Sequence, residues 1–207
     1  MIDGTARRVI QPGLDRAGHW LARRGVKADH VTLLACGLGL AAAALIAMGS
    51  MIAALALILV SRICDGLDGS VARATRKTDF GGYLDITLDF VFYGAIPLGF
   101  VLHDPAANGL AGAVLIFSFY VNGASFLAYA ILAEKHRLTT TQRGVKSIYF
   151  TTGLAEASET FLVFAIFCLW PDWFSPVAWL FAAICLYTAL SRIMQARAEF
   201  SDDLSEA

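Results

Sequence analysis

Long apolar segments separated by short polar turns constrain this chain more than any other feature of its sequence. Hydrophobic residues make up 57% of the 207 residues and charged residues only 16%, which excludes a typical soluble domain. A helix needs about 20 apolar residues to cross a bilayer. The sequence therefore predicts an all-α integral membrane protein with six transmembrane helices. Their apolar parts fall at 31–49, 51–64, 82–102, 110–132, 149–170 and 173–193.

The two ends of the chain differ in composition from the apolar part. Residues 5–24 mix Val, Ile, Leu and Trp with five arginines, which is typical of an amphipathic helix on a membrane surface. Because Pro12 and Gly13 should interrupt a helix, we expect its helical part to begin near Leu14. The last residues are acidic. The chain is thus divided into a juxtamembrane segment (1–30), a six-helix transmembrane domain (31–195) and an acidic tail (196–207).

The basic residues predict how the chain is oriented. With six crossings, the two termini, the turn at 73–81 and the connector at 134–147 share one side of the membrane. All 16 Lys and Arg residues fall on that side or in the helix ends facing it, whereas the turns near 49–51, 104–109 and 171–175 contain none. Basic residues concentrate in cytoplasmic loops. The basic side is therefore expected to face the cytoplasm.

Four aspartates stand where the second apolar segment ends and the third begins. Asp65 and Asp68 are three residues apart, and Asp85 and Asp89 are four apart, so each pair shares one face of a helix. A charge next to hydrocarbon costs at least about 2.5 kcal/mol unless it is compensated. Hard divalent cations, which bind carboxylate oxygens, would compensate it. Arg62, one turn before Asp65, could also neutralise local acid.

The residues between the two aspartate pairs suggest a substrate rich in phosphate. Glycines let phosphate oxygens approach the backbone closely, and Arg73 supplies a positive charge. Two metal ions about 4 Å apart can clamp a pyrophosphate and stabilise its attacking and leaving oxygens. Starting at Asp65, the complete string can be written DGxDGxxAR(x7)GxxxDxxxD.

This string resembles the signature of the CDP-alcohol phosphatidyltransferases, DxxDGxxAR(x8)GxxxDxxxD. A surface helix followed by six spans extends the resemblance over nearly the whole chain. One departure is that seven residues instead of eight separate Arg73 from Gly81. The shorter turn affects contacts assigned within 74–80 and leaves the spacing inside each aspartate pair intact. The resemblance implies a homodimeric enzyme that moves a phosphatidyl group from CDP-diacylglycerol to an alcohol hydroxyl and releases CMP.

The resemblance also implies roles for individual residues. Two divalent ions, Mg²⁺ or Mn²⁺, would be held by Asp65, Asp68, Asp85 and Asp89. Asp89 would in addition act as general base on the acceptor hydroxyl. Gly69 and Arg73 would contact the cytidine diphosphate part of the donor.

The start of the first span offers two further candidates. The family commonly has Pro-Asn-x-x-Thr there, and of this pattern only Thr32 is present, within the sequence ADHVT at 28–32. Thr32 is therefore expected near the donor. Asp29 is expected to be the N-cap of this span, and contact with the nucleotide is the alternative. Thr78, in the shortened turn, is a weaker candidate for a donor contact.

Candidates for the acceptor pocket lie in and just before the fifth apolar segment. Glu156 and Glu159 are expected at a depth similar to that of the second aspartate pair, and intramembrane acids usually mark functional sites. Arg143 and Lys146 could bind a phosphate on the acceptor. The alternative for the two glutamates is hydrogen bonding to neighbouring helices, and the alternative for Arg143 and Lys146 is anchoring at the membrane surface. The acceptor stays open among glycerol 3-phosphate, an inositol phosphate, serine and choline.

Two other classes of function have to be weighed. A membrane prenyltransferase also uses aspartate-bound Mg²⁺ on a pyrophosphate, but its acids stand in two separate motifs of a larger bundle. A non-enzymatic cation carrier would spread its acids through the membrane depth, whereas here they cluster near one face. Dependence on a cytidine nucleotide separates the phosphatidyltransferase from both. Membrane lipid is the expected environment, and no nucleic-acid partner is expected.

Overall fold

The computed structural model describes residues 2–136 and 157–201, and every element in these ranges is a helix. The all-α prediction is therefore confirmed for this part of the chain. In order, the elements are α1 (Ile2–Arg23), α2 (Ala28–Ala47), α3 (Met51–Ala74), α4 (Asp79–His103), α5 (Pro105–Lys135), α7 (Ala157–Leu169), a single 3₁₀ turn η1 (Pro171–Trp173) and α8 (Phe174–Phe200).

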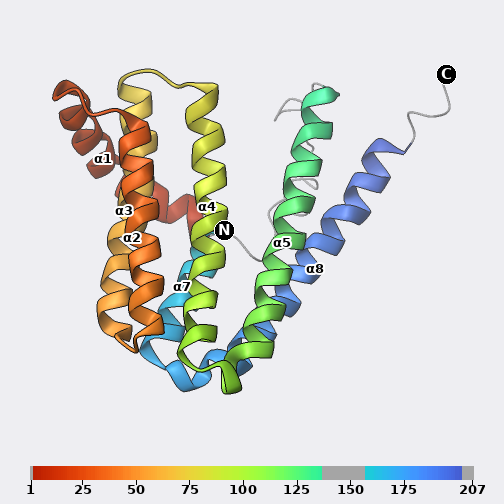
Figure 1. The fold of residues 1–207 in the computed structure, drawn as a ribbon. Coiled ribbons are helices and arrows are strands. Elements are labelled where there is room, and N and C mark those ends of the chain that lie inside the picture. Colours follow the sequence, from red (N-terminus) through yellow and green to blue (C-terminus); the bar gives the residue numbers. More distant parts are fainter. Residues whose placement is uncertain (1, 137–156, 202–207) are drawn as a thin grey trace.

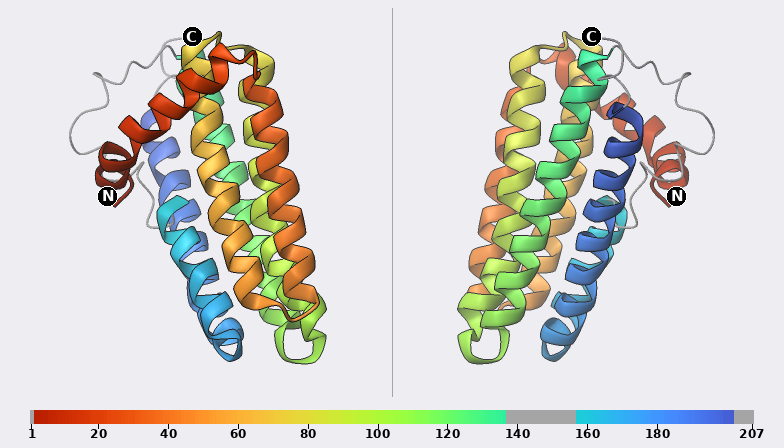
Figure 2. Two further views of the ribbon diagram at one scale, coloured as in Figure 1. Left: turned by 90° about the vertical axis from the view of Figure 1, so that its left-hand side faces the viewer. Right: turned by 90° about the vertical axis from the view of Figure 1, so that its right-hand side faces the viewer.

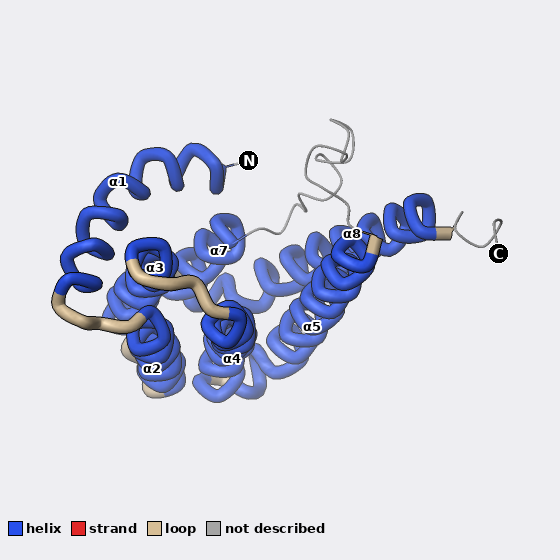
Figure 3. Tube along the Cα trace, turned by 90° about the horizontal axis from the view of Figure 1, so that it is seen from above, coloured by secondary structure: helices blue, strands red, loops and turns tan. Residues whose placement is uncertain are grey.

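The helices form two groups that meet at one end of the molecule (Figure 1). α2 packs against both α3 and α4, and α7 contacts α3. α5 and α8 lie side by side and lean away from α4 toward the end where α3 turns into α4. α1 crosses the bundle obliquely near that end and rests on α3 (Figure 2). Seen from above, α1 therefore borders the end of the bundle that carries the aspartate motif (Figure 3).

Compact turns force successive helices to run antiparallel. Between α2 and α3, Gly49 adopts φ = 81°, a left-handed conformation that glycine enters without strain. Between α4 and α5, Asp104 caps the second helix by accepting a hydrogen bond from the Ala107 N–H at 3.0 Å. Pro105 follows as the first residue of α5, where its missing N–H is not needed.

Aromatic side chains fill the core between the two groups. Phe92, Phe100, Phe164, Phe167 and Phe174 are less than 2% exposed. The rings of Phe100 and Phe174 stack with centroids 4.8 Å apart and so join α4 to α8. A methyl group placed on Gly99 would lie 2.6 Å from the carbonyl oxygen of Ala43, so α2 and α4 approach to backbone contact. This packing fixes how α4 presents its aspartates.

Among the described residues, four helices are long and apolar enough to cross a membrane, namely α2, α4, α5 and the helix formed by η1 and α8. α3 has 24 residues but also contains the charges of the motif, which lower its hydropathy. The described part of α7 has 13 residues, and the first part of the predicted fifth span lies outside the described residues. Large apolar side chains such as Leu110, at 72% exposed, face outward, as expected in lipid. The protein is thus an integral membrane protein with at least these four candidate spans.

Two local predictions about helix ends are wrong. α1 runs without a break through Pro12, although we expected helix only from about Leu14. Proline removes one backbone hydrogen bond, and a side-chain bond from Gln11 to Asp15, at 2.8 Å, spans the same turn. α2 begins at Ala28 with Lys27 as its N-cap, so Asp29 lies in the first turn and does not cap the helix.

Candidate active site

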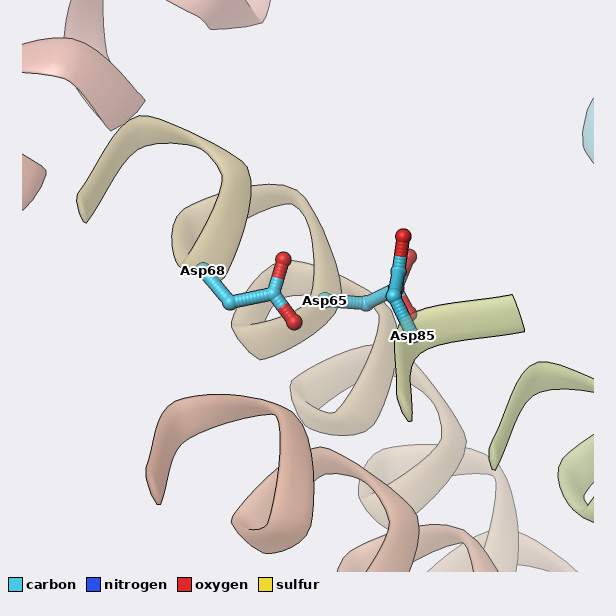
Figure 4. Close-up of side chains that lie close together, drawn as sticks. All are labelled: Asp65, Asp68 and Asp85. Carbon is cyan, nitrogen blue, oxygen red and sulfur yellow. The ribbon is translucent and has the colours of Figure 1, made fainter. Parts of the chain in front are cut away.

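The aspartates of the motif come together at the end of the bundle where α3 turns into α4. α3 contributes Asp65 and Asp68, and α4 contributes Asp85. One carboxylate oxygen from each residue lies within 4.8 Å of the other two. Figure 4 shows the three carboxylates gathered between the two helices. The three-residue spacing in the sequence predicted that Asp65 and Asp68 share one face of α3.

Three carboxylates at this separation fit a divalent cation. Asp68 is only 6% exposed, and its Oδ2 atom is buried without a hydrogen-bond partner among the described groups. An isolated buried carboxylate oxygen is strongly unfavourable. Oxygen donors of this kind suit Mg²⁺ and Mn²⁺. The donor set and the unsatisfied oxygen make these three residues a candidate metal site.

Asp89 lies next to this cluster but bonds to an arginine. Its Oδ1 atom accepts a hydrogen bond from Nη1 of Arg62 at 2.8 Å, and the same nitrogen lies 3.2 Å from Oδ1 of Asp65. The guanidinium group of Arg62 sits 3.8 Å above the ring of Phe92. The expected neutralisation of acid by Arg62 is confirmed and extends to Asp89. The contact with Asp89 was not predicted, because it depends on how α4 is rotated against α3.

A cavity of about 320 Å³ opens beside the cluster, a size at the lower end for small-molecule sites. It lies between the N-terminal ends of α2 and α4 and the C-terminal end of α3. All four residues expected at the donor line it, namely Thr32, Gly69, Arg73 and Thr78. Asp68 and Asp85, two of the expected metal ligands, line it as well. Asp65 and Asp89 do not line this cavity within the described residues. The metal cluster and the predicted donor contacts therefore adjoin one another.

The wall formed by the shortened turn depends on Gly81. The hydroxyl of Thr78 accepts a hydrogen bond from the Gly81 N–H at 3.0 Å and caps α4. A methyl group on Gly81 would lie 2.9 Å from Oγ1 of Thr78 and 3.3 Å from Oδ1 of Asp29. Asp29 therefore lies at the beginning of α4 as well as of α2, and lines the cavity. Contact with the nucleotide was the alternative role expected for Asp29, and its place in the cavity lining is consistent with that alternative.

Arg73 enters the cavity wall from the last turn of α3. Its Nη2 atom donates to Oγ of Ser70 at 2.7 Å and to Oδ1 of Asp15 at 3.0 Å. A methyl group on Gly69 would lie 3.4 Å from Nη1 of Arg73, so the glycine leaves room for the guanidinium group. The hydrogen bond from Arg73 is the main reason that the pKa of Asp15 falls to about 2. No motif in the sequence connects Asp15 with this site.

The predicted acceptor pocket lies largely outside the described residues, which do not include Glu156, Arg143 and Lys146. Glu159 is half-buried in the first turn of α7 and accepts a hydrogen bond from the hydroxyl of Ser158 at 3.0 Å. It does not line the cavity described above.

Sequence reasoning also passed over a buried arginine in α8. Arg192 is 6% exposed and joins α8 to α5. Its Nη1 atom donates to Oγ of Ser125 at 2.6 Å and to the carbonyl and side-chain oxygens of Asn122, both at 3.0 Å. The sequence offered one signal, because Arg192 falls inside the sixth apolar segment. It was interpreted only as one of the basic residues at a helix end.

A second, larger recess of about 710 Å³ lies between α1 and the end of α3. Its lining includes Asp15, Arg16, His19 and Arg23, with Ala74 and Thr75 from α3. It contains none of the motif aspartates. The smaller cavity, which adjoins the carboxylate cluster, is therefore the candidate active site.

A model of the CDP-alcohol phosphatidyltransferase family matches residues 26–194, a range that includes the cluster and the cavity. The chain belongs to this family. It is accordingly an enzyme of the CDP-alcohol phosphatidyltransferase type, which favours this class over the prenyltransferase and the cation carrier.

Curated relatives cover nearly the full length of the chain. It is 43% identical over 193 residues to the inner membrane protein YnjF of Escherichia coli, covering 93% of this chain and 94% of the relative. It is 31% identical over 195 residues to the archaetidylinositol phosphate synthase of Methanothermobacter thermautotrophicus, covering 91% and 88%. The likeness to the first relative supports the interpretation of this chain as an integral protein of the inner membrane.

Solved structures share the fold. The phosphatidylinositol phosphate synthase of Mycobacterium tuberculosis with CDP-DAG bound aligns with a TM-score of 0.72 and 23% identity, covering 89% of this chain and 93% of that one. The same enzyme in complex with manganese and citrate aligns with a TM-score of 0.68, at 87% of both chains. At this level of identity, the likeness concerns the arrangement of the helices.

Proposed function

We propose that this protein transfers a phosphatidyl group from CDP-diacylglycerol to the hydroxyl of an alcohol and releases CMP. The observation that carries the proposal is the cluster of Asp65, Asp68 and Asp85. It adjoins a cavity that also presents Gly69 and Arg73. A carboxylate cluster beside an arginine and a close backbone approach suits a metal-bound pyrophosphate. The CDP-DAG complex of a structural neighbour supports the choice of donor.

The carboxylates would hold Mg²⁺ or Mn²⁺, in line with the manganese complex of the structural neighbour. We propose two ions, with Asp89 as a further ligand beside the three clustered aspartates. The ions would neutralise the charge of the pyrophosphate as it is cleaved. Gly69, Arg73, Thr32 and Thr78 would hold the cytidine diphosphate part of the donor in the cavity.

Asp89 would act as the general base. Its carboxylate would take the proton of the acceptor hydroxyl while the hydroxyl oxygen forms a bond to the phosphorus that carries diacylglycerol. The bond from that phosphorus to the CMP oxygen breaks, and CMP leaves. Arg62 holds Oδ1 of Asp89 at 2.8 Å and so fixes the direction of the carboxylate. A positioned carboxylate needs only to accept a proton as the new bond forms.

For the acceptor, we propose a phosphorylated polyol. Two named relatives are archaetidylinositol phosphate synthases, and the structural neighbour is a phosphatidylinositol phosphate synthase. Arg143 and Lys146 would bind the acceptor phosphate, and Glu156 and Glu159 would line the pocket. These four roles rest on the sequence and on the names of the relatives.

For the membrane arrangement, we propose six spans preceded by α1 on the membrane surface, in a homodimer whose active sites face the cytoplasm. Residues 1–30 would be the juxtamembrane segment, 31–195 the transmembrane catalytic domain and 196–207 the acidic tail. The distribution of Lys and Arg supports this orientation. A total of six spans requires that α3 crosses the membrane together with its motif and that the fifth span begins before α7.

The deciding experiment supplies the purified protein, in lipid vesicles, with CDP-diacylglycerol, Mg²⁺ or Mn²⁺ and one alcohol at a time. The panel contains an inositol phosphate, glycerol 3-phosphate, serine and choline, and both CMP and the lipid product are measured. We expect CMP and a new phospholipid with the inositol phosphate, and neither product when EDTA is present. The proposal would be refuted if no alcohol in the panel gave CMP. Release of pyrophosphate from a prenyl donor would favour the prenyltransferase.

A further inference from the structure

α1 packs on α3 so closely that the backbones of the two helices approach each other at Gly18. A methyl group on Gly18 would lie 2.7 Å from Cβ of Ser70 and 2.9 Å from its carbonyl carbon, so only glycine fits there. One turn away, a methyl group on Gly66 would lie 3.0 Å from Cδ1 of Leu14. Two close approaches, one with the glycine on each helix, fix the position of α1 along α3. The contact between α1 and α3 therefore has a defined register. A surface helix that associated only loosely with α3 would not need one.

At this register, α1 places a carboxylate against the arginine of the motif. Oδ1 of Asp15 accepts hydrogen bonds from Nη2 of Arg73 at 3.0 Å, from Oγ of Ser70 at 2.9 Å and from Nε2 of Gln11 at 2.8 Å. Nη2 of Arg73 donates in turn to Oγ of Ser70 at 2.7 Å. Asp15, Ser70 and Arg73 thus form a closed triangle of hydrogen bonds between the two helices.

The triangle holds one nitrogen of the guanidinium group and leaves the other beside Gly69. Nη2 donates both of the bonds that Arg73 makes in the triangle, whereas Nη1 lies near Gly69, whose missing side chain makes room for it. Arg73 and Gly69 both line the cavity, together with Asp68. Arginine has a long, flexible stem, and its planar fork binds phosphate well only when it is held in the right plane. The Asp15 carboxylate supplies that constraint from outside the motif.

We propose that Asp15 is a positioning residue for donor binding, and that α1 is a working part of the active site. Asp15, assisted by Ser70, holds the plane of the Arg73 guanidinium so that Nη1 meets the diphosphate of the cytidine nucleotide. This inference rests on the proposed function for the identity of the donor. It differs from simple anchoring of α1, which would require the contact but not the orientation of Arg73.

The test measures binding of CDP, in the presence of Mn²⁺, to the full-length protein by calorimetry, and the KM for CDP-diacylglycerol and kcat in vesicles. The variants are Asp15→Ala, Asp15→Glu, Ser70→Ala, Arg73→Ala and the double variant Asp15→Ala/Arg73→Ala. The control is Arg16→Gln, because Arg16 neighbours Asp15 on α1 and lines the larger recess, which contains none of the motif aspartates. Melting temperatures are recorded for every variant.

We expect Asp15→Ala to weaken CDP binding by about three- to tenfold, the range of one partly exposed charge-assisted hydrogen bond. KM for the donor should rise by a similar factor, with kcat, KM for the acceptor and the melting temperature nearly unchanged. Ser70→Ala should show a smaller loss of the same kind, Asp15→Glu a partial recovery and Arg16→Gln no change. In the Arg73→Ala background, loss of Asp15 should have no further effect.

The inference is overturned if Asp15→Ala binds CDP as well as or better than the wild type. It is also overturned if the effects of Asp15→Ala and Arg73→Ala add, or if the loss follows the melting temperature and Asp15→Glu does not recover it. CDP binding can be read without turnover. A wild-type protein that binds CDP but forms no CMP from the CDP-lipid would thus refute the proposed function and leave the inference standing.

Discussion

α3 carries two arginines about three helical turns apart, each bonded to an aspartate, in different surroundings. Arg62 lies deep, with 18% of its side chain exposed, and bonds to two aspartates of the motif itself. Arg73 lies near the end of the helix, with 44% of its side chain exposed, and bonds to Asp15 of α1.

The difference separates compensation of charge from orientation of a ligand-binding group. Removing one partner of a buried ion pair leaves the other charge uncompensated and destabilises the fold. An exposed ion pair contributes little to stability, about 0–1 kcal/mol. Arg62 should therefore matter for folding and for the direction of Asp89, whereas Arg73 should matter for binding of the donor. Four predictions follow from this contrast.

The largest effect is expected at the partner of Arg62. Asp89→Asn should lower transfer at least about 100-fold, because an amide cannot accept the proton of the acceptor hydroxyl. CDP binding should be largely retained, because Asp65, Asp68 and Asp85 still form the cluster. CMP release in a purified assay with Mg²⁺ measures the first effect and calorimetry with CDP the second. Wild-type activity in this variant would refute the assignment of Asp89 as base.

The next effect concerns Arg62 itself. Arg62→Met should destabilise the protein by about 2 kcal/mol in EDTA, because Asp65 and Asp89 lose their shared cation. Mn²⁺ should restore much of the lost stability, since the ion can compensate the charge of the two aspartates in place of Arg62. Melting temperatures with EDTA and with Mn²⁺ measure both, and Arg62→Lys, which keeps the charge, is the matched control. An unchanged melting temperature of Arg62→Met in EDTA would show that this partly buried pair is not needed for compensation.

A smaller effect is expected at Arg73. Arg73→Ala should raise the KM for CDP-diacylglycerol about tenfold, the equivalent of one charge-assisted hydrogen bond to phosphate. Its melting temperature should stay close to that of the wild type, unlike that of Arg62→Met. Arg73→Lys should recover only part of the affinity, because a lysine lacks the planar fork. The same KM in Arg73→Ala as in the wild type would remove Arg73 from the donor site.

The smallest effect concerns pH. The hydrogen bond from Arg73 lowers the pKa of Asp15 from 3.8 to about 2. A lowered pKa means that the contribution of the pair to docking of α1 is complete above about pH 4 and is lost as the pH falls toward 2. The small difference in melting temperature between wild type and Asp15→Asn should thus be constant from about pH 5 to 8. A difference that disappears near pH 6 would contradict the pairing.

Much of this arrangement could be predicted from local sequence. α3 continues through the motif because the stretch contains no proline and Ala, Val and Leu fill its gaps. The carboxylates of Asp65, Asp68 and Asp85 meet because their spacing puts them on facing sides of adjacent helices. Both features depend only on residues close in sequence and on one short turn.

The rest depends on contacts between distant residues. The bond between Arg62 and Asp89 is set by the rotation of α4 against α3, which the packing of Phe92 and its neighbours fixes. Arg73 and Asp15 are 58 residues apart, and only the close packing of Gly18 on Ser70 brings them together. The break expected at Pro12 and the cap expected at Asp29 were wrong. A side-chain bond from Gln11 to Asp15 spans the turn that contains the proline, and α2 begins before Asp29, with Lys27 as its N-cap.

The central claim is that the clustered aspartates hold a divalent cation that binds a cytidine nucleotide. Electron paramagnetic resonance of Mn²⁺, titrated into the purified protein with and without CDP, tests it most directly. We predict saturable Mn²⁺ binding that tightens when CDP is present and is lost in Asp68→Asn, whose wild-type residue has the buried unpaired oxygen. Equal Mn²⁺ binding by Asp68→Asn and the wild type, or binding indifferent to CDP, would contradict the account.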